Sequence, residues 1–110
     1  MTSVRTITVT GGFSSAVTVD IADSMKQLAD ADFRAALVPV GQDDPPPVDS
    51  PTWADADATQ TAATAAVSVP VDGTTALGYY NVAVDVVEGG NHEVVWIADR
   101  RGQRVLVVVT

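Results

Sequence analysis

Apolar and polar residues alternate along most of the chain with a period of two, which is typical of half-buried β-strands. The segments that carry this pattern, or a β-branched apolar run, are residues 4–10, 17–21, 33–40, 66–71, 78–87, 93–98 and 105–109. Turn residues separate them, including Gly11-Gly12, Asp72-Gly73 and the stretch 88–91. The sequence therefore predicts an all-β protein, an immunoglobulin-like antiparallel β-sandwich of about seven to eight short strands.

One segment, residues 23–30, breaks the alternation. Ser24 and Gln27 have the spacing of a helix-capping box, and Met25 and Leu28 lie three apart, on one helical face. We expect one short helical turn here, with an irregular loop as the alternative.

A proline-rich loop is predicted over residues 41–52, because Pro45-Pro46-Pro47 favours extended polyproline geometry. We interpret it as a stiff connector between sheets, the alternative being a docking peptide. Trp53 follows directly and either caps the core or marks a contact surface. We favour the core cap, and keep Trp53 as a candidate apolar anchor for a partner. The pattern of residues 53–64 is too weak to assign an element.

A local motif supports the immunoglobulin-like interpretation. Gly78-x-Tyr80-x-Val82 resembles the tyrosine corner of such sandwiches, in which a tyrosine at a strand start donates its hydroxyl hydrogen to upstream backbone. The last apolar run, residues 105–109, is apolar on both faces and is expected either at the centre of the sandwich or in an oligomer interface.

Composition narrows the class of protein. With 110 residues, 46% of them hydrophobic, the chain can form one domain over residues 1–110. No apolar run approaches the roughly 20 residues of a membrane span, and no secretory signal is visible. The absence of cysteine excludes disulfides and thiolate chemistry, and a net charge of -8 argues against nucleic-acid binding.

Candidate chemistry is sparse, and we expect a protein that is not an enzyme and needs no cofactor. His92 is the one histidine, and its neighbour Glu93 would point to the opposite face of a strand, so a catalytic relay is not expected. Acidic pairs at 20/23, 43/44 and 55/57 could be imagined as calcium ligands, but solvated carboxylates explain them better. A glycosidase role for the pair 55/57 would need a carboxylate across a cleft.

Three arginines stand out against the acidic background. Arg100, Arg101 and Arg104 gather at one predicted turn beside the last strand. They form either a solvated hairpin tip or an anchor for an acidic partner surface, since guanidinium groups pair bidentately with carboxylates. They are the main candidate partner-binding residues.

The order of motifs in the last third of the chain resembles a known group of proteins. A Gly78-x-Tyr80 strand, a Gly89-Gly90 hairpin, a strand ending at Trp96-Ile97 and a terminal valine run follow one another. This order is similar to small β-sandwich accessory proteins of tailed bacteriophages, including those of actinobacterial phages and the N-terminal domain of phage baseplate upper proteins.

The resemblance implies a virion structural protein that assembles in the host cytoplasm. Its partners would be the major capsid protein or other virion proteins, and it would form a homo-oligomer on the particle. The leading hypothesis is a capsid decoration or minor capsid protein that cements the shell. A tail or baseplate module, and a carbohydrate-binding or adhesive immunoglobulin-like domain, are the alternatives.

Overall fold

The computed structural model describes residues 4–22, 28–42, 44–96 and 104–110, with the backbone alone at 4, 5, 22, 95, 96 and 104. Within them lie eight strands and one 3-10 turn. These are β1 (Val4–Val9), β2 (Ser15–Ala22), η1 (Leu28–Asp30), β3 (Asp32–Pro39), β4 (Ala54–Gln60), β5 (Thr64–Val71), β6 (Gly78–Glu88), β7 (Asn91–Trp96) and β8 (Arg104–Val109). The all-β prediction is confirmed. Of the expected helical turn, η1 is the described part, while the capping box lies outside the described residues.

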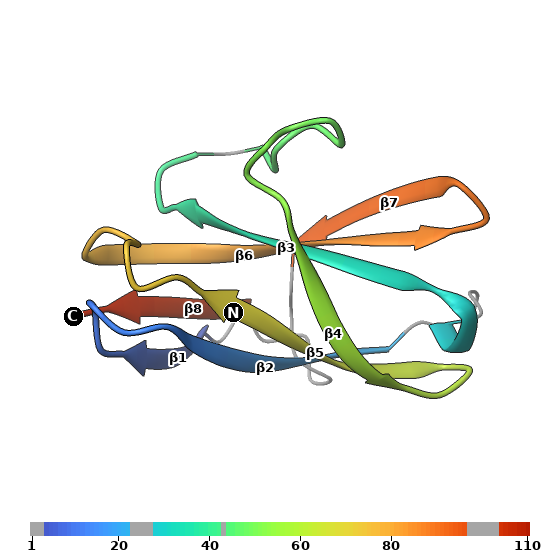
Figure 1. The fold of residues 1–110 in the computed structure, drawn as a ribbon, viewed down its shortest axis with the longest axis horizontal. Helices are drawn as coiled ribbons and strands as arrows, with labels where there is room; N and C mark the ends of the chain where they lie inside the picture. The colour runs from blue at the N-terminus through green and yellow to red at the C-terminus, as the bar shows by residue number, and fades with distance from the viewer. Residues whose placement is uncertain (1–3, 23–27, 43, 97–103) are drawn as a thin grey trace.

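The strands form a near-barrel, sandwich-like arrangement with the order β1-β8-β6-β3-β4-β5-β2, and β7 pairs with β6. β4 connects the two layers, because residues 54–56 pair with β3 and residues 57–60 pair with β5 (Figure 1). The described pairs are antiparallel, as expected, except that β1 lies parallel to β8. These two strands stand far apart in sequence, so no tight hairpin constrains their relative direction.

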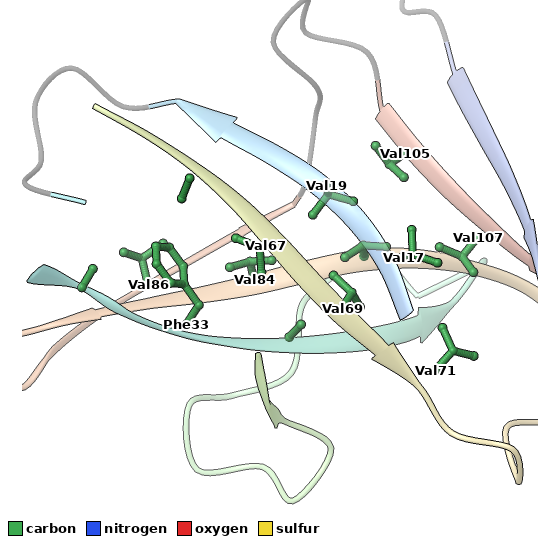
Figure 2. Packing of buried hydrophobic residues seen from close by; sticks show 14 of the residues in the cluster. Val17, Val19, Phe33, Val67, Val69, Val71, Val84, Val86, Val105 and Val107 are labelled. Carbon is green, nitrogen blue, oxygen red and sulfur yellow. The ribbon is translucent and has the colours of Figure 1, made fainter. Parts of the chain in front are cut away.

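The main core fills the space between the layers, with β2 and β5 facing β3 and β6 (Figure 2). Its buried members are Val17, Val19, Leu28, Ala31, Phe33, Ala35, Ala65, Val67, Val69, Val71, Val82, Val84, Val86, Val105, Val107 and Val109. The period-two pattern assigned the apolar faces of these strands correctly. Since each fully buried valine stabilises the fold by about 1.5 kcal/mol or more, this face is the main source of stability.

The last strand, β8, is central rather than peripheral, because it lies between β1 and β6. Val105, Val107 and Val109 are buried, while Leu106 and Val108 on the opposite face are half-buried. Of the two expected environments for an apolar strand, the structure therefore shows the sandwich centre.

The start of β6 is a tyrosine corner, as the sequence predicts. The hydroxyl of Tyr80 donates to the carbonyl oxygen of Ala76 at 2.6 Å. The other end of β6 turns directly into β7 through Gly89 and Gly90, whose φ angles are 57° and 82°. Two successive positive φ angles define the tight hairpin turn that glycine favours.

The predicted turn at Asp72-Gly73 closes with a hydrogen bond from the Thr75 N–H to the Asp72 carbonyl at 3.0 Å. Asp72 Oδ1 also accepts the Thr74 N–H at 2.9 Å and the Thr74 hydroxyl at 3.1 Å. These bonds, the backbone bond foremost, favour the charged carboxylate and lower the pKa of Asp72.

A folded-state pKa below the unfolded value stabilises the fold above the unfolded-state pKa, and this stabilisation is lost as the pH falls through the folded-state pKa. Thr74→Val removes the hydroxyl and keeps the backbone N–H. We expect the pKa of Asp72 to rise part of the way toward its ordinary value, as measured by NMR titration of the carboxyl carbon. Thr75→Val is the control, because the Thr75 N–H donates to the backbone carbonyl of Asp72 and not to its carboxylate. An Asp72 pKa that Thr74→Val leaves unmoved would contradict the role of the hydroxyl.

No helix in the described part of the chain is long and apolar enough to cross a bilayer.

Candidate functional site

The outer face of the β3–β6–β7 layer, turned away from the main core, carries a second and smaller apolar cluster. It consists of Ala36, Val38, Trp53 and Ala83, with Val94 packed against it. The loop segment of residues 44–52 runs above this face (Figure 1). The Trp53 indole nitrogen donates to the Pro47 carbonyl at 2.8 Å, which ties the loop to the sheet. Trp53 is 9% exposed and packs within this cluster, as the core-cap interpretation expects. The stiff-connector interpretation of the loop stays a prediction.

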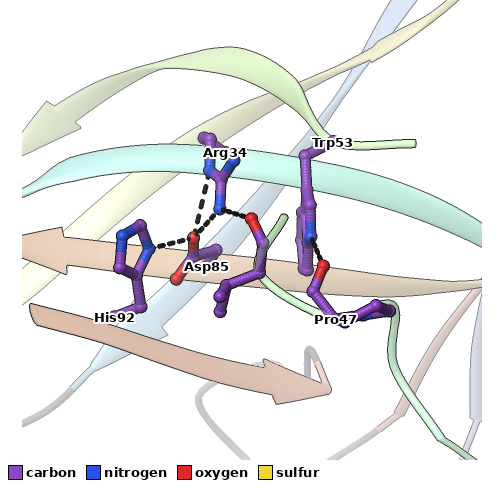
Figure 3. Close-up of polar contacts among 6 residues, drawn as sticks. Arg34, Pro47, Trp53, Asp85 and His92 are labelled. Atoms are coloured by element: carbon purple, nitrogen blue, oxygen red, sulfur yellow. Dashed lines mark hydrogen bonds and ion pairs between the residues drawn. The ribbon is translucent and has the colours of Figure 1, made fainter. Parts of the chain in front are cut away.

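Beside this cluster lies a polar group that we call the outer-face network, formed by Arg34, Asp85 and His92 (Figure 3). Asp85 is fully buried in the middle of β6. Its Oδ2 accepts the Arg34 Nε–H at 3.0 Å and a second hydrogen bond from Arg34 Nη2. The same oxygen lies 2.7 Å from His92 Nδ1. One carboxylate oxygen therefore joins β3, β6 and β7.

The strand register brings these three residues together. Arg34 stands directly opposite Asp85 in the antiparallel β3–β6 pair. In the β6–β7 pair Asp85 stands opposite Val94, so His92 is its diagonal neighbour on the same face. Diagonal neighbours are about 7–8 Å apart at the backbone, a distance that an aspartate and an imidazole can span together.

Arg34 is held by more than its carboxylate. Its Nη2 also donates to the Val48 carbonyl at 2.8 Å, and its Cζ lies 5.4 Å from the centre of the Trp53 ring. The guanidinium therefore contacts the sheet, the covering loop and the second cluster at once. Asp85 Oδ1 is buried and, among the described residues, has no hydrogen-bond partner, which costs about 1–3 kcal/mol.

A groove of about 520 Å³ opens next to the network. It is lined by Asp32, Phe33, Arg34, Asp55, Ala56, Asp57, Val87 and His92. The structure thus brings Asp32 beside the pair 55/57, a neighbour that the sequence pattern does not predict. All three carboxylates are exposed, whereas an acid that donates a proton in glycoside hydrolysis is typically buried in apolar surroundings.

A buried aspartate that holds a histidine is the arrangement that orients a general base in many hydrolases. The local sequence offers only Glu93 as such a partner for His92, whereas the partner in the structure is Asp85, which comes from the neighbouring strand. The residues that line the groove carry neither a hydroxyl nor a thiol that could act as nucleophile. Since Asp85 also binds Arg34, the geometry fits a structural connection between three strands.

The predicted partner-binding residues are only partly described. Arg100 and Arg101 lie outside the described residues, and of Arg104 the structure gives the backbone position as the first residue of β8. Whether the three arginines share one surface stays a prediction. The ring of Trp53 is buried and its N–H donates to the Pro47 carbonyl, so only a small part of the side chain is exposed for contact with a partner.

The acidic pairs do not converge on a metal site within the described part of the chain. No group of three or more histidine, aspartate or glutamate side chains there could hold a metal ion. Asp23 and Asp43 lie outside the described residues. Asp55 and Asp57 face the groove together.

Comparison with known proteins leaves the function to be inferred from the structure. No protein-family model matches the chain, and its sequence matches no curated protein.

Proposed function

We propose that this protein is a non-enzymatic structural protein of a tailed-phage particle, a decoration or minor capsid protein that binds the shell and joins neighbouring subunits. The proposal rests on the sequence resemblance of the last third of the chain. It is supported by one structural observation above all, the tyrosine corner in which Tyr80 holds the Ala76 carbonyl at 2.6 Å. That bond is a mark of immunoglobulin-like sandwiches in general, and it supports the sandwich architecture that the proposal requires.

The polar groups of the outer face add support. In the Arg34–Asp85–His92 network, charged and polar side chains connect three strands, and the residues that line the adjoining groove carry no hydroxyl or thiol. A structural protein of a particle would gain stability from its neighbours there by mass action.

A tail or baseplate module is the second candidate, favoured by the similarity to the N-terminal domain of baseplate upper proteins. The two roles differ in copy number, because a decoration protein occupies the many equivalent positions of a shell. Both use the same sandwich, so the fold does not separate them.

The contact prediction for Arg100, Arg101 and Arg104 is tested by reversing their charge. If the arginines pair with carboxylates of the shell, the triple change to glutamate should lower occupancy on purified particles by at least about tenfold. Occupancy is measured by cosedimentation and quantitative gel densitometry.

A matched control separates this contact from a general charge effect. Arg100→Glu/Arg101→Glu and Arg5→Glu/Lys26→Glu change the net charge equally. The first pair should weaken binding and the second should leave it unchanged. Full occupancy by the triple variant would refute the arginine contact, and equal losses in both pairs would show that only net charge matters.

A further inference from the structure

One end of the molecule displays large apolar side chains to solvent. Phe13 is 70% exposed, Leu77 71%, Tyr79 61% and Val40 56%. They come from the β1–β2 turn, the β5–β6 connection, the start of β6 and the residue after β3. Figure 1 shows these segments gathered at the end of the molecule where the C-terminus lies. We call these four residues the apolar end.

Contacts between the segments show that they adjoin. The Val40 N–H donates to the Tyr79 carbonyl at 3.1 Å. A Cβ added to Gly11 would lie 2.7 Å from Leu77 Cδ2, so the leucine packs across the β1–β2 turn. A Cβ added to Gly73 would lie 3.3 Å from the backbone of Phe13. The four residues of the apolar end therefore project from segments that adjoin one another.

Hydrogen bonds hold the backbone beneath this surface. The tyrosine corner holds Ala76, the residue before Leu77, and the Gly11 N–H donates to the Thr110 carbonyl at 2.7 Å. The Asp72–Thr74 bonds order the neighbouring turn. Exposed apolar side chains on a rigid backbone lose little entropy on binding, which is how preorganised interfaces gain affinity.

Charge is distributed unevenly between the two ends. The carboxylates of η1, of the start of β3, of β4 and of the β6–β7 hairpin lie away from the apolar end, with Asp30, Asp32, Asp57 and Glu88 as examples. One exposed carboxylate, that of Asp72, lies in the turn beside Phe13. Two copies of a chain with a net charge of -8 repel each other less when they meet through the apolar end than through the end that carries the larger group of carboxylates.

We propose that the apolar end is a self-association surface and that two copies of the chain pack there about a two-fold axis. A two-fold interface uses the same patch on both copies, and contiguous exposed apolar surface is the usual mark of such a patch. The proposal concerns the free chain in solution, so its failure would leave the particle-binding function standing.

Sedimentation equilibrium of the full chain tests this inference. Between about 1 µM and 1 mM protein, the range of weak to moderate association, the mass should rise from 11.4 kDa toward twice that value. Raising the salt from about 0.05 M to 0.5 M should tighten association, because salt screens the repulsion between acidic chains.

Variants locate the interface. Phe13→Ser/Leu77→Ser should weaken association by about tenfold or more, as loss of central apolar anchors does. Val48→Ser is the matched control, since Val48 is 44% exposed but lies on the loop above the outer face, and association should be unchanged. Circular dichroism verifies that each variant is folded. A wild-type chain that stays monomeric at 1 mM, or equal weakening by the control, overturns the proposal.

Discussion

Arg34→Met is expected to lower the free energy of unfolding by about 3–5 kcal/mol, because it leaves a buried carboxylate without its cation. Asp85 is fully buried, and Arg34 donates two of the hydrogen bonds that its Oδ2 accepts. The measurement is urea denaturation followed by tryptophan fluorescence. Arg34→Lys, which keeps the charge and loses the forked geometry, should fall between wild type and Arg34→Met.

A double variant distinguishes two explanations of this loss. Either the Arg34–Asp85 pair stabilises the fold, or the loss comes from leaving one charged partner buried without the other. Asp85→Leu combined with Arg34→Met should recover much of the lost stability, since apolar replacement of a buried ion pair is often neutral or stabilising. It also removes Asp85 Oδ1, the buried acceptor without a partner among the described residues. A cost below about 1 kcal/mol for Arg34→Met alone would mean that the pair behaves as an exposed one, contrary to its burial.

Trp53→Ala should lower the free energy of unfolding by about 3–5 kcal/mol, the usual cost of deleting a large aromatic side chain from a packed cluster. The ring packs with Ala36, Val38 and Ala83, and its N–H holds the Pro47 carbonyl. The loop of residues 41–52 should therefore become sensitive to protease as well. Denaturation and limited proteolysis measure the two effects.

Two comparison variants separate the contribution of the Trp53 N–H from that of the packed ring. Trp53→Phe keeps much of the ring and removes the N–H donor, so it should cost about 1–2 kcal/mol. Val48→Ala, at an exposed position of the same loop, should stay within about 0.5 kcal/mol of wild type. Unchanged stability in Trp53→Ala together with lost particle binding would reverse the assignment and make the indole a partner anchor.

The valine-rich strands could be predicted because burial on one face imposes a period of two. Val67, Val69 and Val71 alternate with half-buried or exposed residues, and all three lie in the main core. The tyrosine corner was predictable for a similar reason, since it depends on local sequence: Tyr80 binds a carbonyl only four residues upstream.

β4 was missed because its residues are poor strand formers. Ala54–Gln60 alternates alanine with aspartate and threonine, and alanine and aspartate are depleted in strands. The pattern itself was present, since Ala56 and Ala58 pack against the main core while Asp55 and Asp57 point to the groove. What makes the segment a strand is the pairing with β3 and β5, which no local preference reveals.

The outer-face network could not be derived because it depends on register between distant strands. Arg34 and Asp85 are 51 residues apart in sequence. One signal was nonetheless available, since Asp85 stands between Val84 and Val86 in an apolar strand, and a buried carboxylate requires a cationic or hydrogen-bonding partner. That signal predicts a partner without identifying it. The parallel pairing of β1 with β8 is hidden for the same reason.

The number of copies of the chain in purified phage particles tests most directly the claim that the protein acts by binding to a particle. Phage particles from a lysate that contains the protein are purified on a density gradient, and the chain is counted against the major capsid protein by quantitative mass spectrometry. We expect the chain in the particle band at a fixed ratio, with copies on the order of hundreds for a shell position. A chain that stays at the top of the gradient, absent from intact particles, would contradict the proposed function.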